Sequence, residues 1–321
     1  MSRYVLDHHL EGEKKRLGLM SQLLDPMHRR HIESLGISCE PRVLEVGCGN
    51  GSMSVWMAEH VAPDGQIVAL DLDLSLVDNV RAPGVEFRQG DIVTGPPGRF
   101  DFVTARAVLH HVADAKAATG NLVASLRPGG AILLIEPDFL PVSVAEPIEM
   151  RTFWSGWLAW SRKRGIDYHI GRTLAPRLAA YGLKEIEGTA ETAIYNGGSQ
   201  WADYWRETIT ELRRDLVQSG KLNDALVDAF LAQCAEPELE DPDNRIYCRS
   251  CACAGQLTAC SRELPSSPRL RRDLPSSDYG MASETAWAGT DLQLFCRLDM
   301  KRKSRPRPTK NRVPPWSWNL G

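Results

Sequence analysis

Short apolar segments alternate with amphipathic ones along residues 42–136, and this alternation constrains the fold more than any other feature. Segments with helical periodicity occur at 52–61, 74–81 and 115–127. The apolar segments around them are RVLEV (42–46), QIVAL (66–70), VEFRQ (85–89), FDFVTA (100–105) and AILLIE (131–136). Strands that alternate with helices form a parallel sheet with helices on both faces. We therefore expect an α/β domain with a doubly wound, Rossmann-like sheet.

The flanking segments predict further helices and one more strand. Apolar residues recur at helical spacing within 10–36, and helices are also expected at 171–183, 199–218 and 222–234. Residues 184–195 have the pattern of a strand, and RPGG (127–130) predicts a turn.

Three glycines follow the first predicted strand directly. Gly47, Gly49 and Gly51 alternate with other residues in VLEVGCGNG (43–51). Glycine accepts the positive φ values of a tight turn and allows a ligand to approach the backbone. The next helix begins near Ser52, so its N–H groups face the same loop. The pattern predicts a cofactor site, although a plain tight turn is the alternative.

The residues around the glycines distinguish between two kinds of cofactor. A dinucleotide site requires G-x-G-x-x-G, but Ser52 occupies the last glycine position. Glu45 precedes the glycines, and a carboxylate there would repel a pyrophosphate. It suits a ligand that has an ammonium group and no phosphate, such as S-adenosylmethionine. A nicotinamide oxidoreductase is therefore disfavoured.

Acidic residues follow the second and third predicted strands. Asp71 ends VALD and could accept hydrogen bonds from both ribose hydroxyls, with Asp73 as its competitor. Asp91 in GDI (90–92) could accept from an adenine amino group while Ile92 packs on the ring. The alternatives are a solvated acid for Asp71 and a turn or helix cap for Asp91.

Together, VLEVGCGNG, VALDLD, GDI, FDFVTARAVLHHV and LRPGGAILLIEPD resemble the class I S-adenosylmethionine-dependent methyltransferases. The likeness is greatest to the small-molecule branch related to ubiquinone biosynthesis, and it covers residues 4–250. It implies a seven-stranded sheet of order 3-2-1-4-5-7-6, with a helical substrate cover between strands five and six. It also implies cofactor contacts along the glycine loop and at the strand ends, from Glu45, Gly47, Cys48, Gly49, Gly51, Asp71, Leu72, Asp91, Ile92, Ala105 and Arg106.

His110 and His111 follow the fourth predicted strand, where such folds open into the active site. A histidine of near-neutral pKa could remove a proton from the methyl acceptor. The alternative is a residue that starts a helix or packs on the cofactor. Methyl transfer from an activated sulfonium depends chiefly on positioning and on exclusion of water.

Aromatic residues gather at helical spacing in the segment that follows the fifth strand: Phe153, Trp154, Trp157 and Trp160. We favour a core stripe. The alternative is a lid over an apolar substrate pocket, with Tyr168, His169 and Arg172 nearby.

The chain divides into an N-terminal helical segment (1–36), a methyltransferase domain (37–250, with a possible substrate cover at 141–183) and a tail (251–321). Seven basic residues and no acid occupy 301–321 of a chain whose net charge is −3. The tail is rich in Ser, Pro and Arg, so we expect weak order there and favour a solvated tail over one that binds nucleic acid or a membrane. The abrupt change in composition also raises the hypothesis that the reading frame was lost near residue 250, which would leave strand seven incomplete, with 292–298 as a substitute edge strand.

Cysteine spacing and apolar runs bear on metals and localisation. The spacing of Cys248, Cys251, Cys253 and Cys260 matches no standard zinc pattern, so we expect no metal. No apolar run reaches the length of a membrane span and no signal peptide is visible, which predicts a soluble, cytoplasmic protein.

The sequence thus predicts an S-adenosylmethionine-dependent methyltransferase of a small organic molecule, as a monomer or homodimer without membrane or nucleic-acid partners. Residues 104–111 lack the Asn/Asp-Pro-Pro-aromatic motif of base methyltransferases. A cofactor-binding protein without catalysis is the main alternative, ahead of a nucleic-acid or protein methyltransferase.

Overall fold

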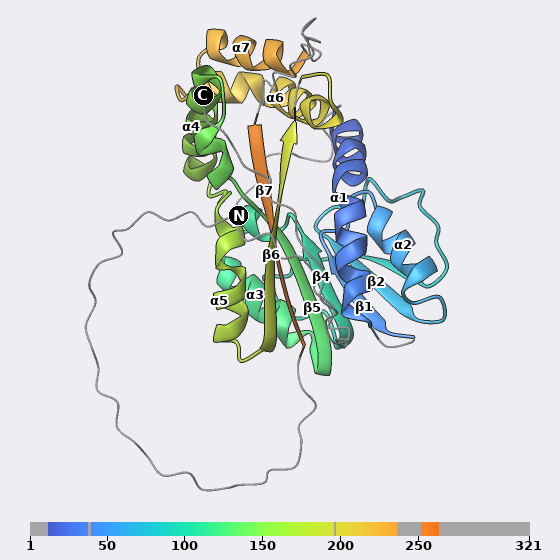
Figure 1. The fold of residues 1–321 in the computed structure, drawn as a ribbon. Helices are drawn as coiled ribbons and strands as arrows, with labels where there is room; N and C mark the ends of the chain where they lie inside the picture. The colour runs from blue at the N-terminus through green and yellow to red at the C-terminus, as the bar shows by residue number, and fades with distance from the viewer. Residues whose placement is uncertain (1–11, 38–39, 196, 236–251, 263–321) are drawn as a thin grey trace, which may run out of the picture. The chain divides into compact units, whose positions relative to one another are not determined.

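The parallel sheet expected from the sequence forms the centre of the protein. The computed structural model describes residues 12–37, 40–195, 197–235 and 252–262. The sheet has seven strands in the order β3-β2-β1-β4-β5-β7-β6, as the resemblance implied (Figure 1). Its first five strands pair in parallel: β1 (Arg42–Val46), β2 (Gln66–Asp71), β3 (Val85–Gln89), β4 (Phe100–Arg106) and β5 (Leu126–Asp138).

Helices cover both faces of the sheet, because successive strand residues point to opposite sides. Val43 packs with α1 (Glu13–Leu35) and α2 (Ser52–His60). Its neighbour Leu44 packs with α3 (Ala115–Ala124) and α5 (Leu174–Ala180). Each fully buried aliphatic side chain of these two layers contributes roughly 1.5–3 kcal/mol.

A third core lies beyond the carboxyl ends of the strands. It joins α4 (Ile148–Lys163), α6 (Gln200–Gln218) and α7 (Asp224–Ala235), which lie together at the top of Figure 1. The segment expected as a substrate cover, 141–183, contributes α4 to this cluster. The three clusters leave the loops after β1, β2, β3 and β4 between the sheet and the upper helices.

The sequence prediction of a helix at 74–81 is wrong. That segment forms consecutive turns, in which the N–H groups of Val77 and Val80 bond to carbonyls three residues back. The Asp73 carboxylate accepts from Ser75 N–H at 2.8 Å, as the cap of a helix would, but the backbone then continues in turns and no helix forms.

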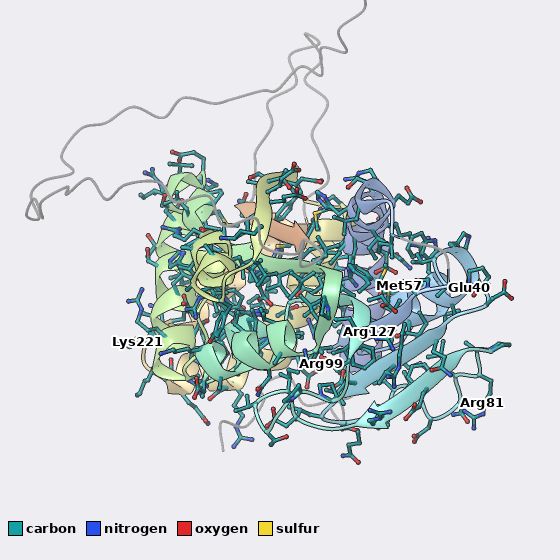
Figure 2. All side chains as sticks on the ribbon, turned by 90° about the horizontal axis from the view of Figure 1, so that it is seen from below. Glu40, Met57, Arg81, Arg99, Arg127 and Lys221 are labelled. Carbon is teal, nitrogen blue, oxygen red and sulfur yellow. The ribbon has the colours of Figure 1, made fainter. Side chains whose placement is uncertain are left out.

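The prediction of a turn at 127–130 is also wrong, because β5 begins at Leu126 and these residues belong to it. The pairing with β4 shifts register between Phe100 and Phe102, so the extra residues form an irregularity inside the strand. Gly129 adopts a φ of 83° there. Figure 2 views this end of the sheet, opposite to the loops after β1–β4, where Arg127 pairs with Asp101.

Residues 252–262 form the seventh strand of the sheet, whereas the sequence analysis expected weak order from residue 251. β7 (Ala252–Arg262) lies between β5 and β6 (Lys184–Tyr195) and is antiparallel to both. Backbone pairing on two sides fixes a strand even where the sequence has no apolar periodicity. The composition change at residue 250 therefore does not mark an incomplete sheet.

Other sequence predictions fall outside the described residues. These include the basic segment 301–321, the substitute strand 292–298 and the cysteines at 248 and 251. Among the helices that the structure describes, none combines the length and the hydropathy needed to cross a membrane.

Candidate active site

A cavity of about 280 Å³ opens where β1 lies between β2 and β4. The chain leaves β1 and β4 in opposite directions at this point, which is where open α/β sheets bind ligands. Its walls come from α1 and from the loops after four strands: Leu17, Met20, Val46, Gly47, Gly49, Leu70, Asp71, Leu72, Asp73, Gly90, Asp91, Ile92, Arg106, Ala107, Val108, His111 and Val112. We call this space the cofactor cavity.

The glycine loop needs its glycines for backbone geometry. Gly47, Gly49 and Gly51 have φ values of 75°, 53° and 78°. A Cβ atom on Gly47 would lie 2.3 Å from Cγ2 of Val108. The loop after β4 therefore packs directly on the Gly47 backbone, and only glycine permits that approach.

Asp71 ties the glycine loop to the end of β2. One carboxylate oxygen accepts from Gly49 N–H at 2.8 Å and the other from Leu72 N–H at 2.7 Å. A carboxylate has further lone pairs, so these bonds orient Asp71 and leave acceptor capacity toward the cavity. Asp73 also lines the cavity but bonds to Ser75, in the turn that follows.

Arg106 brings a buried cation to the cavity wall. Its Nη2 donates to Asp25 of α1 at 2.7 Å, and the arginine side chain is 9% exposed. Its Nη1 is buried without a hydrogen-bond partner in the part of the chain that the structure describes. Arg106 lines the cavity, and its positive charge would favour an anionic ligand group such as a carboxylate nearby.

Asp91 and Ile92 close the opposite side of the cavity. Ile92 is buried, while the Asp91 carboxylate accepts from Val93 N–H at 2.8 Å. Asn121 of α3 donates to the carbonyls of Ile92 and Val93 and so fixes this loop. Asp91 and Ile92 thus both border the cavity, and their contact with adenine stays a prediction.

Four of the predicted cofactor residues do not line the cavity. Glu45 is the main correction: its carboxylate is buried and accepts from Ser54 Oγ of α2. Burial raises its pKa to about 7, partly offset by Ser54. Cys48 and Ala105 are buried, and Gly51 packs against Phe87 and Val77. These four residues pack within the protein next to the glycine loop and do not face the cavity.

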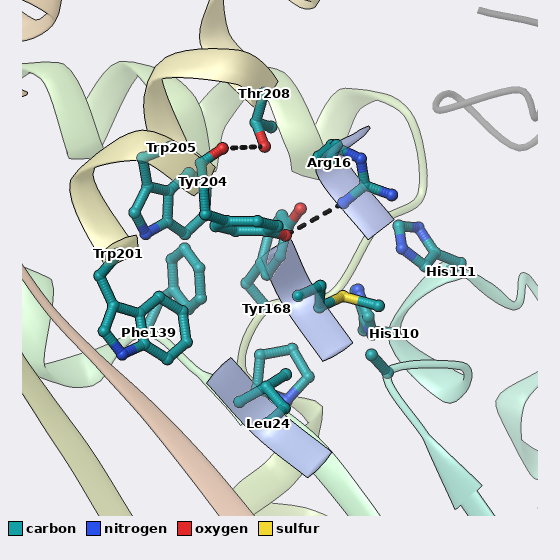
Figure 3. Close-up of a pocket in the computed structure, with 13 residues that line it drawn as sticks. Arg16, Leu24, His110, His111, Phe139, Tyr168, Trp201, Tyr204, Trp205 and Thr208 are labelled. Carbon is teal, nitrogen blue, oxygen red and sulfur yellow. Dashed lines mark hydrogen bonds between the residues drawn. The ribbon is translucent and has the colours of Figure 1, made fainter. Parts of the chain in front are cut away.

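A second, narrower pocket of about 60 Å³ adjoins the cofactor cavity (Figure 3). The two spaces share the residues Met20, Ala107 and His111. The other residues come from α1, α6, the loop after β4, the end of β5 with the residue after it, and the segment between α4 and α5: Arg16, Leu24, His110, Pro137, Phe139, Tyr168, Trp201, Tyr204, Trp205 and Thr208. We call this the acceptor pocket.

The two predicted histidines occupy different places. His111 lies on the boundary of the two spaces, whereas His110 lines the acceptor pocket alone. Burial lowers the pKa of His110 to about 3. Burial, with His110 and Arg16 nearby, lowers the pKa of His111 well below its usual value. Both imidazoles are therefore neutral at physiological pH, unlike the near-neutral pKa that the sequence analysis assumed.

Glu136, at the end of β5, organises the loop that carries both histidines. Its carboxylate accepts from the N–H groups of Val108 (2.8 Å), Leu109 (2.7 Å) and His110 (3.3 Å). It also lies 2.8 Å from Nδ1 of His110. Burial raises the Glu136 pKa to about 7, against the backbone hydrogen bonds that lower it. A proton held between Glu136 and Nδ1 leaves Nε2 of His110 with a lone pair.

A buried ion pair borders the acceptor pocket on the side of α1. Arg16 donates from Nε and Nη2 to the Glu13 carboxylate at 2.7 and 2.6 Å. Its Nη1 donates to the Tyr204 hydroxyl at 3.1 Å, as Figure 3 shows. Both charged side chains are almost fully buried.

The aromatic stripe of α4 belongs to the core, as favoured from its spacing. Phe153, Trp154, Trp157 and Trp160 are buried with Phe230 and Trp205, and none of the four lines either space. Tyr168 does line the acceptor pocket. Arg172 instead pairs with Asp138 at 2.5 Å, with His169 beside them.

Sequence reasoning missed Glu136, Arg16 and Tyr204. A carboxylate at the end of the apolar strand AILLIE was a usable signal for Glu136, because a buried acid requires partners. Arg16 and Tyr204 lie 188 positions apart on two ordinary amphipathic helices. No local pattern indicates that they meet.

Residues 12–187 match a protein family described as "Methyltransferase domain". The match covers more than half of the chain, so the chain belongs to this family. S-adenosylmethionine is the cofactor of such domains, and the glycine loop, the oriented Asp71 and the positive charge of Arg106 give the cofactor cavity groups that fit it.

Curated relatives resemble only part of this chain. A ubiquinone/menaquinone biosynthesis C-methyltransferase of Pseudomonas putida is 32% identical over 115 residues, 33% of this chain and 45% of that protein. Phosphoethanolamine N-methyltransferase 1 of Triticum aestivum is 24% identical over 221 residues, 66% of this chain and 39% of that protein. The matches thus span less than half the length of these relatives.

Comparison with solved structures gives matches at low sequence identity. Phosphoethanolamine N-methyltransferase 2 of Haemonchus contortus, in complex with phosphomonomethylethanolamine and S-adenosylhomocysteine, is 15% identical with a TM-score of 0.45. The likeness covers 78% of this chain and 52% of that one.

Proposed function

We propose that this protein transfers the methyl group of S-adenosylmethionine to a small organic molecule held in the acceptor pocket. The observation that carries the proposal is the shared boundary at Met20, Ala107 and His111, which joins a cofactor cavity to a second, largely apolar pocket. Transfer requires donor and acceptor to meet in line, and this boundary is where the two spaces meet.

The residues that would hold the cofactor are distributed over four loops. The Gly47 and Gly49 backbone would receive the amino-acid part, with the positive charge of Arg106 near its carboxylate. Asp71 would accept from the ribose hydroxyls, and Asp91 with Ile92 would border the adenine. Glu45 supports the loop from behind and is no longer assigned the ammonium group.

The bound cofactor supplies a methyl group that is already activated on a sulfonium. The protein's own contribution is to orient the acceptor, to exclude water and to receive a proton where the acceptor is an alcohol or amine. His111, neutral and at the boundary, is placed to accept that proton, with His110 as the second candidate. Its lowered pKa makes it a weak base, so positioning supplies most of the rate.

The first test is calorimetric titration of S-adenosylhomocysteine into the full chain and into Asp71→Ala. Loss of two hydrogen bonds to a charged group predicts binding weaker by roughly 100-fold. Asp64→Ala, an exposed turn residue, removes a carboxylate elsewhere and should bind like the parent. Unchanged affinity in Asp71→Ala would contradict the site, and binding without turnover on any acceptor would favour the non-catalytic alternative.

A further inference from the structure

The polar end of the acceptor pocket is a fixed assembly of Glu13, Arg16 and Tyr204. The two-point bond between Glu13 and Arg16 is buried, with exposed fractions of 0% and 3% for the two side chains. The pair is electrically neutral as a unit, and its planar geometry holds the guanidinium in one orientation.

The Tyr204 hydroxyl is left as a hydrogen-bond donor toward the pocket. It accepts from Arg16 Nη1 at 3.1 Å, and the described contacts give it no acceptor for its own hydrogen. A hydroxyl that accepts from a guanidinium becomes a stronger donor, because hydrogen bonds in a chain polarise one another. The Thr208 hydroxyl, by contrast, donates to the Tyr204 carbonyl at 2.8 Å (Figure 3).

The charges around the pocket disfavour an ammonium group and a phosphate. No aspartate or glutamate is among the described residues that line it, and both histidines are neutral. The Arg16 guanidinium already lies over the Tyr204 ring, 5.7 Å from its centre, so a ligand ammonium group cannot bind that face of the ring. A phosphate dianion would meet one cation whose charge Glu13 compensates.

Aromatic rings form much of the remaining wall, together with the aliphatic side chains of Met20, Leu24 and Pro137. The Phe139 and Tyr168 rings stack at 4.4 Å, and the Tyr204 and Trp205 rings meet edge-on at 5.1 Å. The volume of about 60 Å³ admits only a compact group beyond the boundary with the cofactor cavity.

We infer that the acceptor is a compact planar molecule that presents a carbonyl or carboxylate oxygen to Tyr204, and that ammonium and phosphate compounds are excluded. Tyr204, held by Arg16 and Glu13, is the specificity-determining residue. The inference rests on the proposed function, since it names the substrate class of that site, and it separates the acceptor chemistry of this chain from that named for its phosphoethanolamine relatives.

The test uses four probes titrated into the full chain saturated with S-adenosylhomocysteine: 2-hydroxyacetophenone, salicylate, phenol and phosphoethanolamine. We expect the first two to bind at least tenfold more tightly than phenol, which lacks the second oxygen, and phosphoethanolamine not to bind. Tyr204→Phe should weaken the binding of 2-hydroxyacetophenone and salicylate until their affinities equal that of phenol. Tyr181→Phe removes a hydroxyl outside both spaces, bonded to the Lys116 carbonyl, and should change nothing.

The possible outcomes distinguish failure of this inference from failure of the proposed function. Three results would overturn the inference alone. They are tighter binding of phosphoethanolamine than of the other probes, equal binding of phenol, 2-hydroxyacetophenone and salicylate, and no binding of any probe to the chain saturated with S-adenosylhomocysteine. Failure to bind S-adenosylhomocysteine would overturn the proposed function and the inference with it. The comparison among probes uses the unmodified chain, so it holds even if Tyr204→Phe fails to fold.

Discussion

The cofactor cavity and the acceptor pocket share a boundary but are built by different means. The cavity is made largely from backbone at strand ends, with glycines at positive φ and with acids that accept from backbone N–H groups of these loops. The pocket is made from side chains of α1, α6, the loop after β4, the end of β5 and the segment between α4 and α5, joined by bonds between distant segments. Short sequence motifs at the strand ends therefore specify much of the cofactor cavity, whereas tertiary packing specifies the acceptor pocket. Mutations in the two spaces should have different effects on stability and binding.

The largest expected effect is on the acceptor side, from Glu13→Ala. Removal of one partner from a buried ion pair leaves the Arg16 charge without its carboxylate and should lower the free energy of unfolding by about 3–5 kcal/mol. Urea denaturation measures the loss. Glu207→Ala breaks the pair with Lys15, which is 66% exposed, and should cost about 1 kcal/mol or less. Equal losses in the two variants would show that the buried Glu13–Arg16 pair contributes no more to stability than the exposed Glu207–Lys15 pair.

On the cofactor side, Gly47→Ala should weaken S-adenosylhomocysteine binding by about 100-fold. The φ of 75° costs an L-residue about 1–2 kcal/mol, and the new Cβ must displace Val108, 2.3 Å away. Gly165→Ala is the matched control: its φ is 77°, nothing lies within 4 Å of the added atom, and it borders neither space. Both variants should lose stability in calorimetry, but only Gly47→Ala should lose affinity.

Near the boundary of the two spaces, Glu136→Gln should increase local opening of the loop at residues 108–110 more than it weakens cofactor binding. The amide replaces an oxygen that accepts backbone N–H groups, which predicts a loss of about 2 kcal/mol in the free energy of unfolding. Hydrogen exchange of the Val108, Leu109 and His110 amides should accelerate by more than tenfold, while S-adenosylhomocysteine affinity changes by less than about threefold. Unaltered exchange at these amides would remove Glu136 from its positioning role.

The free energy of unfolding should also depend on pH, with opposite signs for Glu45 and for His111 at the boundary of the two spaces. Glu45 has a raised pKa, so its contribution to stability is full below pH 4.5 and is lost as the pH rises to about 7. His111 has a lowered pKa, so its contribution is present above pH 6.5 and is lost as the pH falls. Each slope approaches about 1.4 kcal/mol per pH unit.

Urea denaturation between pH 4.5 and 8 distinguishes the two contributions. Glu45→Gln should reduce the loss as the pH rises, to which Glu136 also contributes, and His111→Gln should reduce the loss as the pH falls, to which His110 also contributes. If both variants shift the stability profile in the same direction, burial does not set these two pKa values as described.

Much of the fold was predictable, because its signals are local. Strand and helix periodicity placed β1 to β6, and the glycines identified the loop that approaches the cofactor. The errors arose where turns or strand pairing overrode the pattern. Residues 74–81 form turns with backbone bonds three residues apart, although their apolar spacing and the bond from Ser75 N–H to Asp73 would suit a helix. β7 formed because two strand edges offered it backbone partners, although its composition indicated weak order.

The sequence by itself, through its family resemblance, indicated the sheet order and the cofactor, and it named seven of the residues that line the cofactor cavity, because these depend on motifs of a few adjacent residues. Only the tertiary structure decided that Glu45 supports the glycine loop from behind, that Glu136 shapes the histidine loop, and that Arg16 meets Tyr204. Each of these depends on which buried polar groups must find partners when helices and strands pack. The acceptor pocket is made of such pairs, and so the chemistry of the acceptor is determined by the packed structure.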